Sequence, residues 1–311
     1  MLKDLCLLNG TSGDESAVRD YIISKIKDNC EYKVDALGSI IAFKKGKKIT
    51  NKKLMICAHM DEVGFIITDI TDDGYLKFAP VGGIDARIVA DRKVTINNIN
   101  GVIGLKPIHL LSSDEKEKAV SFKNLFIDIG AKDKSDAEKF VSLGDFVYFS
   151  SNYYEFGEGF IKAKALDDRI GCMLMIELIN SALEYDTYFC FNVQEEVGLR
   201  GSKCTSFDIQ PDISVILEST TAADLCGVTG GDRFAFWVTV LLYRLWTAEL
   251  FTIRLYIILR ERQQMIIISL HRQKLQLPAE MMQVQFKQAV REAKLLQYRF
   301  LADIFTPHQA L

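Results

Sequence analysis

Apolar and polar positions alternate along this chain in a pattern that predicts a mixed α/β domain. After residues 11–14, apolar residues recur at helical spacing from Val18 to Ile26, which predicts a capped amphipathic helix of about four turns. A second helical periodicity covers 170–183. Short β-type runs predict strands at 32–34, 39–43, 53–58, 189–193 and 213–218. Helices and buried strands in this order indicate an open sheet covered by helices.

The stretch 65–159 has a different pattern. It consists of many short β-type runs separated by Gly, Asp and Asn, and it contains no long helical periodicity. We therefore expect a small β-barrel-like domain inserted into the α/β domain. The α/β domain would then be discontinuous, formed by 1–64 and 160–232.

Two adjacent acidic residues follow a predicted strand in the stretch 191–201, FNVQEEVGLRG. Glu195 and Glu196 follow an apolar run, and the glycines after them signal a turn, so we expect the pair at the carboxyl rim of the sheet. Ligands bind at that rim in open α/β sheets, and one carboxylate there could hold a metal while its neighbour acts as a general base. The alternative is a solvated Glu-Glu turn, since acids are common in turns.

Three other element ends carry residues of the same kind. His59 and Asp61 follow the strand 53–58, and their spacing lets an imidazole bind a metal while the carboxylate orients the ring. Asp167 opens the helical segment, and Glu218 closes the strand 213–218. A structural histidine and an ordinary helix-capping aspartate are the alternatives.

The four motifs together identify a resemblance. AHMDEVGF, KALDDRIG, QEEVGLRGS and LEST, in this order and at these spacings, resemble the dinuclear-metal aminopeptidases of the tetrahedral or glutamyl aminopeptidase family, some members of which carry an older cellulase label. The resemblance covers roughly the first three quarters of the chain. It implies an α/β fold with an open mixed-sheet metallo-exopeptidase domain and an inserted β-barrel-like domain. It also implies His59 and Glu196 as ligands of a first metal, Glu218 as ligand of a second, Asp167 as the bridge, Asp61 as the group that orients His59, and Glu195 as the general base.

The resemblance further implies a chemistry and a set of partners. Two divalent ions about 3.5–4 Å apart can activate a water for attack on a peptide, and mixed imidazole and carboxylate ligands suit zinc, cobalt or manganese. The expected partners are peptide substrates and copies of the same chain, since the inserted domain mediates a homo-oligomer in the family, commonly a dodecamer. Deacylases and carboxypeptidases that use two metal ions have the same kinds of metal ligands and remain alternatives. A non-catalytic remnant that only oligomerises is a further alternative.

Composition excludes several other classes. The 311 residues carry a net charge of -3, which gives no footprint for nucleic acid, and charged residues interrupt the apolar run 250–270, which excludes a membrane span there. Amphipathic helices are the alternative for that run. The seven cysteines lack CxxC spacing and the N-terminus has no secretory signal, so we expect reduced thiols and a cytoplasmic protein.

The region 233–311 departs from the rest of the chain. All 20 glycines lie at or before Gly231, although a domain of this kind needs turns. Three segments, 237–247, 277–287 and 294–311, can be reread at one and the same codon offset as sequence that resembles the family's C-terminal segment. Our hypothesis is a single-base deletion near 233–237. The tail would then be out of frame, His308 would not be the family's last metal ligand, and the chain as written is predicted to be misfolded or inactive.

Overall fold

The structure is a computed structural model that describes residues 1–49, 51–113, 120–157, 160–219, 227, 242–247, 250–259 and 264–272. The chain divides into a unit of Met1–Arg272 and a unit of Gln273–Leu311. The second unit lies outside the described residues, and so does most of the predicted out-of-frame tail 233–311.

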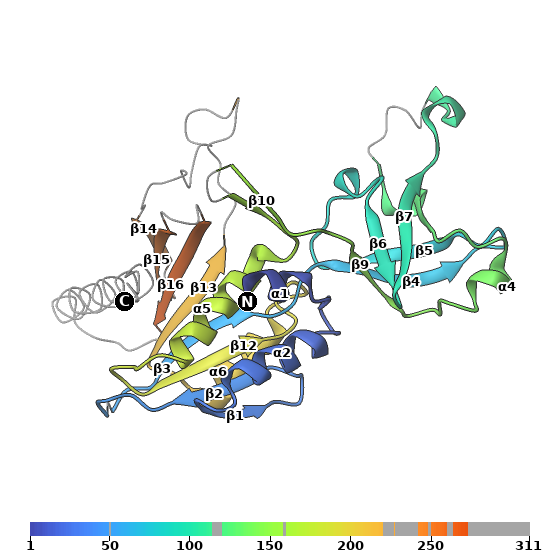
Figure 1. Ribbon diagram of the computed structural model, residues 1–311. Coiled ribbons are helices and arrows are strands. Elements are labelled where there is room, and N and C mark those ends of the chain that lie inside the picture. Colours follow the sequence, from blue (N-terminus) through green and yellow to red (C-terminus); the bar gives the residue numbers. More distant parts are fainter. Residues whose placement is uncertain are drawn as a thin grey trace. The chain divides into compact units, whose positions relative to one another are not determined.

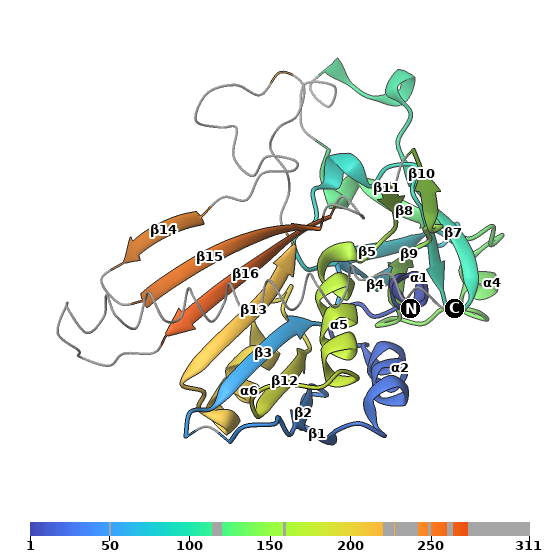
Figure 2. The ribbon, with the colours of Figure 1, turned by 60° about the vertical axis from the view of Figure 1, so that its left-hand side comes forward.

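The larger sheet of the first unit has eight strands (Figures 1 and 2). They are β1 (Glu31–Val34), β2 (Ile40–Lys44), β3 (Leu54–His59), β12 (Thr187–Asn192), β13 (Ile213–Ser219), β14 (Leu242–Thr247), β15 (Leu250–Leu259) and β16 (Gln264–Arg272). Their spatial order is β1-β2-β12-β3-β13-β16-β15-β14. The three strands β12, β3 and β13 are parallel, and every other pairing in the sheet is antiparallel. The predicted mixed sheet is therefore confirmed.

The register brings the carboxyl ends of the three parallel strands level with one another. Asn192 of β12 pairs with His59 of β3. On the other side, Ile216 of β13 pairs with Cys57, so Glu218 stands level with His59 two residues later. Strand β3 is buried along almost its whole length, as expected for the centre of a parallel sheet. Residues at these strand ends therefore converge on one edge of the sheet.

Helices cover the sheet and position further residues at this edge. They are α1 (Leu2–Leu7), α2 (Ser16–Ile26), α5 (Leu166–Ile179) and α6 (Arg200–Ile209). Helix α5 packs on β3 and β13, α1 and α2 pack on α5, and α6 contacts β12. In Figure 1, α2 and α5 lie in front of the sheet. Helix α5 is apolar on nearly all sides, which suits its place between the sheet and the N-terminal helices.

The middle of the chain forms a closed barrel. Its strands are β4 (Gly64–Ile70), β5 (Leu76–Val81), β6 (Lys93–Ile96), β7 (Ile99–Leu105), β8 (Leu125–Asp128) and β9 (Phe146–Phe149). They close in the order β4-β5-β8-β7-β6-β9 around a core that includes Phe65, Ile67, Ile103, Ile127 and Val147. A register shift between Ile67 and Asp69 keeps Ile70 buried, because the extra residue reverses the alternation. The predicted barrel-like fold is confirmed.

Short elements complete the unit. They are η1 (Ala86–Ile88), η2 (Ile108–Leu110), η3 (Phe122–Asn124), α4 (Lys134–Ala137) and a two-stranded sheet of β10 (Tyr154–Phe156) and β11 (Phe160–Lys162). No helix among the described residues is long and apolar enough to cross a membrane.

Two expectations about local structure were wrong. The predicted four-turn capped helix is the 11-residue α2, whose N-cap is Glu15 and which has no side-chain cap hydrogen bond, because the polar side chains before it bond elsewhere. The alternative of amphipathic helices across 250–270 fails because β15 and β16 occupy that stretch. With β14, these strands extend the sheet beyond β13, whereas the sequence alone suggested that the tail contributes no strand to the domain.

Candidate metal centre

Three of the predicted ligands meet at the carboxyl edge of the parallel strands. The ligand atoms of His59, Asp167 and Glu218 lie within 4.8 Å of one another. His59 Nε2 is 3.4 Å from Asp167 Oδ1 and 3.6 Å from Glu218 Oε1. His59 is buried at the end of β3, Asp167 begins α5 and is half exposed, and Glu218 lies near the end of β13. The fold thus brings together donors that are 51 to 159 positions apart only through strand register and the packing of α5.

The electrostatics of this cluster favour a positive charge. Burial lowers the pKa of His59, but hydrogen bonds to Asp167, Asp61 and Glu218 outweigh it and hold the pKa well above its ordinary value. Burial raises the pKa of Glu218 to about 7, although His59 opposes the shift. The same carboxylates that favour a protonated imidazole favour a divalent cation in its place, because both neutralise crowded negative charge. One imidazole and two carboxylates are a donor set that zinc and similar ions accept, so the residues fit a metal.

The neighbouring acid of Asp167 has a different role. Asp168 is fully buried, and its Oδ1 accepts a hydrogen bond of 3.1 Å from the backbone N–H of Gly171. Burial raises the pKa of Asp168 well above its ordinary value. Asp168 therefore has the helix-capping role that was the alternative for this motif, because it bonds within the first turn of α5. Asp167 instead faces His59.

Asp61 is the centre of a hydrogen-bond network at this edge. Its Oδ1 accepts from the backbone N–H of Glu195 at 2.9 Å, and its Oδ2 accepts from that of Glu196 at 3.1 Å. The hydroxyl of Ser12 donates to Oδ2 at 2.6 Å. His59 Nδ1 lies 3.1 Å from the backbone carbonyl oxygen of Asp61 and 3.4 Å from its Oδ1. The predicted proximity of Asp61 to the ring is therefore present, with the carbonyl oxygen as the nearer partner.

The acidic pair lies at the predicted rim, in the turn that follows β12. Both side chains are partly buried, and burial is the main cause that raises the pKa of Glu195 and of Glu196. Neither side chain belongs to the group of ligand atoms around His59. The sequence grouped Glu196 with His59 and assigned Glu218 to the other metal, whereas the structure places Glu218 beside His59.

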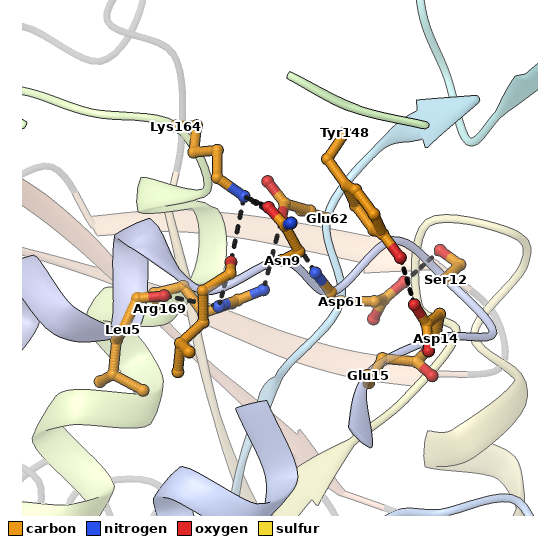
Figure 3. A network of polar contacts seen from close by, with 12 residues as sticks. Leu5, Asn9, Ser12, Asp14, Glu15, Asp61, Glu62, Tyr148, Lys164 and Arg169 are labelled. Carbon is orange, nitrogen blue, oxygen red and sulfur yellow. Dashed lines mark hydrogen bonds and ion pairs between the residues drawn. The ribbon is translucent and has the colours of Figure 1, made fainter. Parts of the chain in front are cut away.

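Sequence reasoning missed a buried ionic network that joins residues of the segments after β3 and before α5 (Figure 3). Lys164 Nζ lies 2.5 Å from Glu62 Oε1 and also donates to the carbonyl oxygen of Leu8 at 3.0 Å. Arg169, with no exposed side-chain surface, donates to the carbonyl oxygen of Leu5 at 2.6 Å. Burial lowers the pKa of Lys164. Lys164 and Arg169 thereby bind the N-terminal segment, and the presence of Glu62, Lys164 and Arg169 inside the motifs AHMDEVGF and KALDDRIG was the available signal.

A second missed feature comes from the segment before α2. The side chain of Glu15 is buried, and its Oε1 accepts from the backbone N–H groups of Gly13 at 2.9 Å and Gln194 at 3.1 Å. Burial raises the pKa of Glu15 above its ordinary value. The sequence predicts only a helix cap at 11–14 and gives no role to Glu15.

The comparison with family models gives a match to M42 glutamyl aminopeptidase over residues 38–233. That range contains His59, Asp61, Asp167, Glu195, Glu196 and Glu218.

Among individual proteins, the chain is 38% identical over 237 residues to the putative aminopeptidase FrvX of Escherichia coli, covering 73% of this chain and 66% of FrvX. It thus spans just under two thirds of that relative's length. It is also similar to the solved aminopeptidase APDkam598 from the archaeon Desulfurococcus kamchatkensis, with a TM-score of 0.72 and 34% identity over 78% of this chain and 68% of that one. The solved TET1 peptidase of Pyrococcus horikoshii, which can assemble into a tetrahedron or a large octahedral shell, gives a TM-score of 0.64 and 36% identity over 74% of this chain and 72% of that one.

Proposed function

Because this chain belongs to the M42 glutamyl aminopeptidase family, we propose that it is a metal-dependent aminopeptidase that hydrolyses N-terminal residues from peptides. The observation that carries the proposal is the cluster of His59, Asp167 and Glu218 at the carboxyl edge of the sheet. Its neighbour, the Glu195-Glu196 turn, supplies a carboxylate that is suited to proton transfer.

We assign His59, Asp167 and Glu218 to one divalent ion, because their ligand atoms already lie together. Asp167 and Glu196 are our candidates for a second ion, with Asp167 as the bridge. This exchanges the places of Glu196 and Glu218 in the assignment drawn from the sequence. Zinc, cobalt and manganese all suit these donors. Bound ions would polarise the scissile carbonyl and lower the pKa of a water.

In this proposal Glu195 is the general base. It takes a proton from the attacking water and later delivers it to the leaving amine. Burial raises its pKa, which brings the carboxylate nearer to the range in which it can both accept and return a proton. Asp61 holds the backbone of Glu195 and contacts the ring of His59, so it orients both the base and a metal ligand.

We also propose that the chain forms a homo-oligomer whose contacts involve the barrel domain, and that its substrates are peptides. The support is its likeness to TET1 of Pyrococcus horikoshii, together with a separately closed barrel. The domain limits 1–64 with 160–232 and 65–159 remain our proposed boundaries for these two parts.

The test uses the purified full chain, stripped of metal with EDTA. In contrast to the inactivity expected from the altered region 233–311, this proposal predicts release of an N-terminal residue from a peptide with a free amino terminus after addition of zinc, cobalt or manganese, and no release from the N-acetylated peptide. His59→Ala and Glu195→Gln should abolish release, whereas Glu31→Gln, an exposed acid on β1, should not change it. Release that persists in EDTA, or in the His59→Ala variant, would contradict the proposal.

The absence of glycine after Gly231 favours a second candidate, an inactive remnant that keeps only the capacity to oligomerise. Metal stoichiometry separates the two candidates. The enzyme should bind two ions per subunit, whereas the remnant should bind one ion weakly or none. Sequencing the gene across the codons for 230–240 tests the cause. If sequencing finds an additional base there, residues 233–311 result from a reading-frame error, and the corrected reading restores the family's C-terminal segment.

A further inference from the structure

Three consecutive backbone N–H groups in the turn after β12 donate to two buried carboxylates. Gln194 donates to Glu15 Oε1 at 3.1 Å, Glu195 to Asp61 Oδ1 at 2.9 Å, and Glu196 to Asp61 Oδ2 at 3.1 Å. Gln194 has a φ of 53°, in the left-handed region that residues other than glycine seldom adopt. The path of this turn is thus fixed by acceptors that lie outside it.

Both carboxylates depend on the segment that precedes α2. Glu15 belongs to that segment, and the hydroxyl of Ser12 donates to Asp61 Oδ2 at 2.6 Å (Figure 3). Ser12 is itself held in place, since its backbone N–H donates to the carbonyl oxygen of Glu62 at 3.3 Å. The segment and the turn are far apart in sequence, with 179 positions between Glu15 and Gln194.

Helix capping does not account for these two side chains. Glu15 occupies the N-cap position of α2, yet the helix has no side-chain cap hydrogen bond, and the Glu15 carboxylate bonds to Gly13 and Gln194. The residues Ser12 and Glu15 are only 6% and 5% exposed. Buried acceptors and donors of this kind are retained where they have partners, because an unpaired polar group costs free energy.

We infer that Ser12 and Glu15 are positioning residues for the carboxylates of Glu195 and Glu196. They act through backbone hydrogen bonds, Glu15 directly on Gln194 and Ser12 through Asp61. The inference rests on the proposed function in that Glu195 is the base whose position is set. A displacement of a reacting group by 1 Å can reduce the rate about 100-fold. Hydrogen bonds that fix the backbone of this turn therefore help to keep the Glu195 carboxylate in a reactive position.

The first experiment follows amide hydrogen exchange of the metal-free full chain, without substrate. Glu15→Met removes the acceptor while keeping the size of the side chain, Glu15→Gln keeps an acceptor oxygen, and Ser12→Ala removes the donor to Asp61. We expect the amide of Gln194 to exchange about 10- to 100-fold faster in Glu15→Met, and less than that in Glu15→Gln. Ser12→Ala should accelerate the amide of Glu196.

Two controls identify a local effect. The barrel amides of Ile127 and Val147 should exchange at the parent's rate in every variant, and Glu31→Met, at an exposed acid, should leave residues 194–196 unchanged. Equal exchange of the Gln194 amide in Glu15→Met and in the parent would overturn the inference. So would an equal acceleration in the barrel, which would show a general loss of stability. If Glu15→Met does not fold, Ser12→Ala and Glu15→Gln decide by the same comparison.

The second experiment measures kinetics with a peptide substrate. We expect Glu15→Met and Ser12→Ala to lower kcat about 10- to 100-fold while KM stays within about twofold. The Glu15→Gln variant, which keeps an acceptor oxygen, should retain most of the parent's kcat. A rise in KM at constant kcat would contradict the inference. A parent chain without any peptidase activity would contradict the proposed function instead, and the exchange measurement would still decide on the positioning of the turn.

Discussion

Asp61 Oδ1 lies 2.9 Å from the backbone nitrogen of Glu195, although 134 positions separate the two residues. This hydrogen bond joins the segment after β3 to the turn after β12. The same carboxylate lies 3.4 Å from the ring of His59. One buried acid thereby couples the geometry of a candidate metal ligand to that of the candidate base.

Replacing Asp61 should therefore affect both stability and metal binding. Asp61→Ala leaves the donors of Ser12, Glu195 and Glu196 without their acceptor, and we expect a loss of about 3 kcal/mol or more in the free energy of unfolding. We also expect zinc affinity to fall 10- to 100-fold, as is typical when the partner of a ligand is removed. Urea unfolding and calorimetric titration with zinc measure the two effects. Unchanged zinc affinity in a folded variant would contradict the coupling of Asp61 to the metal site.

The buried pair of Lys164 and Glu62 should be sensitive to the loss of one partner. Their side chains are 8% and 5% exposed, and Lys164→Met leaves Glu62 with only the more distant guanidinium of Arg169, at 3.8 Å, as an ion-pair partner. Because part of the charge compensation remains, we expect a destabilisation of about 3 kcal/mol, at the lower end for a broken buried pair. The double variant Lys164→Met with Glu62→Gln should be destabilised by clearly less than the sum of the single changes. Additive single effects, measured by urea unfolding, would show that the two groups do not interact.

The barrel core should respond to loss of volume. Ile127 on β8 is completely buried, and Ile127→Ala should cost about 2–5 kcal/mol. Val102 on β7 is 44% exposed, and Val102→Ala is the matched control, expected to stay within about 0.5 kcal/mol of the parent. Urea unfolding followed by circular dichroism checks both values. Equal effects of the two substitutions would contradict the inward direction assigned to Ile127.

Thiol reactivity should differ sharply between Cys6 and Cys204. Cys6 is fully buried, and burial raises its pKa from 9.0 to about 11, whereas Cys204 is exposed. Iodoacetamide at pH 8 should therefore modify Cys204 in the folded protein and Cys6 only after unfolding, as judged by peptide mass spectrometry.

The same shift has a consequence for stability. Because folding raises the pKa of Cys6, its stabilising contribution is present below pH 9.0 and is lost as the pH rises toward 11. We expect Cys6→Ala to show a smaller loss of stability than the parent between pH 9 and pH 11. An identical pH dependence in both proteins would contradict the shift.

The sequence alone was sufficient for most strands of the first 219 residues and for their approximate order, but not for the strands β14 to β16. Alternation of apolar residues is a local property of a strand, so the strands that end at His59 and near Glu218 were recognisable one at a time. The rim position of Glu195 and Glu196 followed from the turn glycines after them. The barrel-like character of 65–159 was likewise visible from its short runs, although the order in which its strands close was not.

Only the tertiary structure decided which acidic residues lie beside His59. Strand register and the packing of α5 bring Glu218, and not Glu196, beside His59, and no local pattern contains this information. For the same reason residues 11–14 were expected to cap the helix, whereas Ser12 bonds to Asp61 and the adjacent Glu15 bonds to Gln194. Polar side chains before a helix have several possible acceptors and donors, and burial against the rest of the chain selects among them.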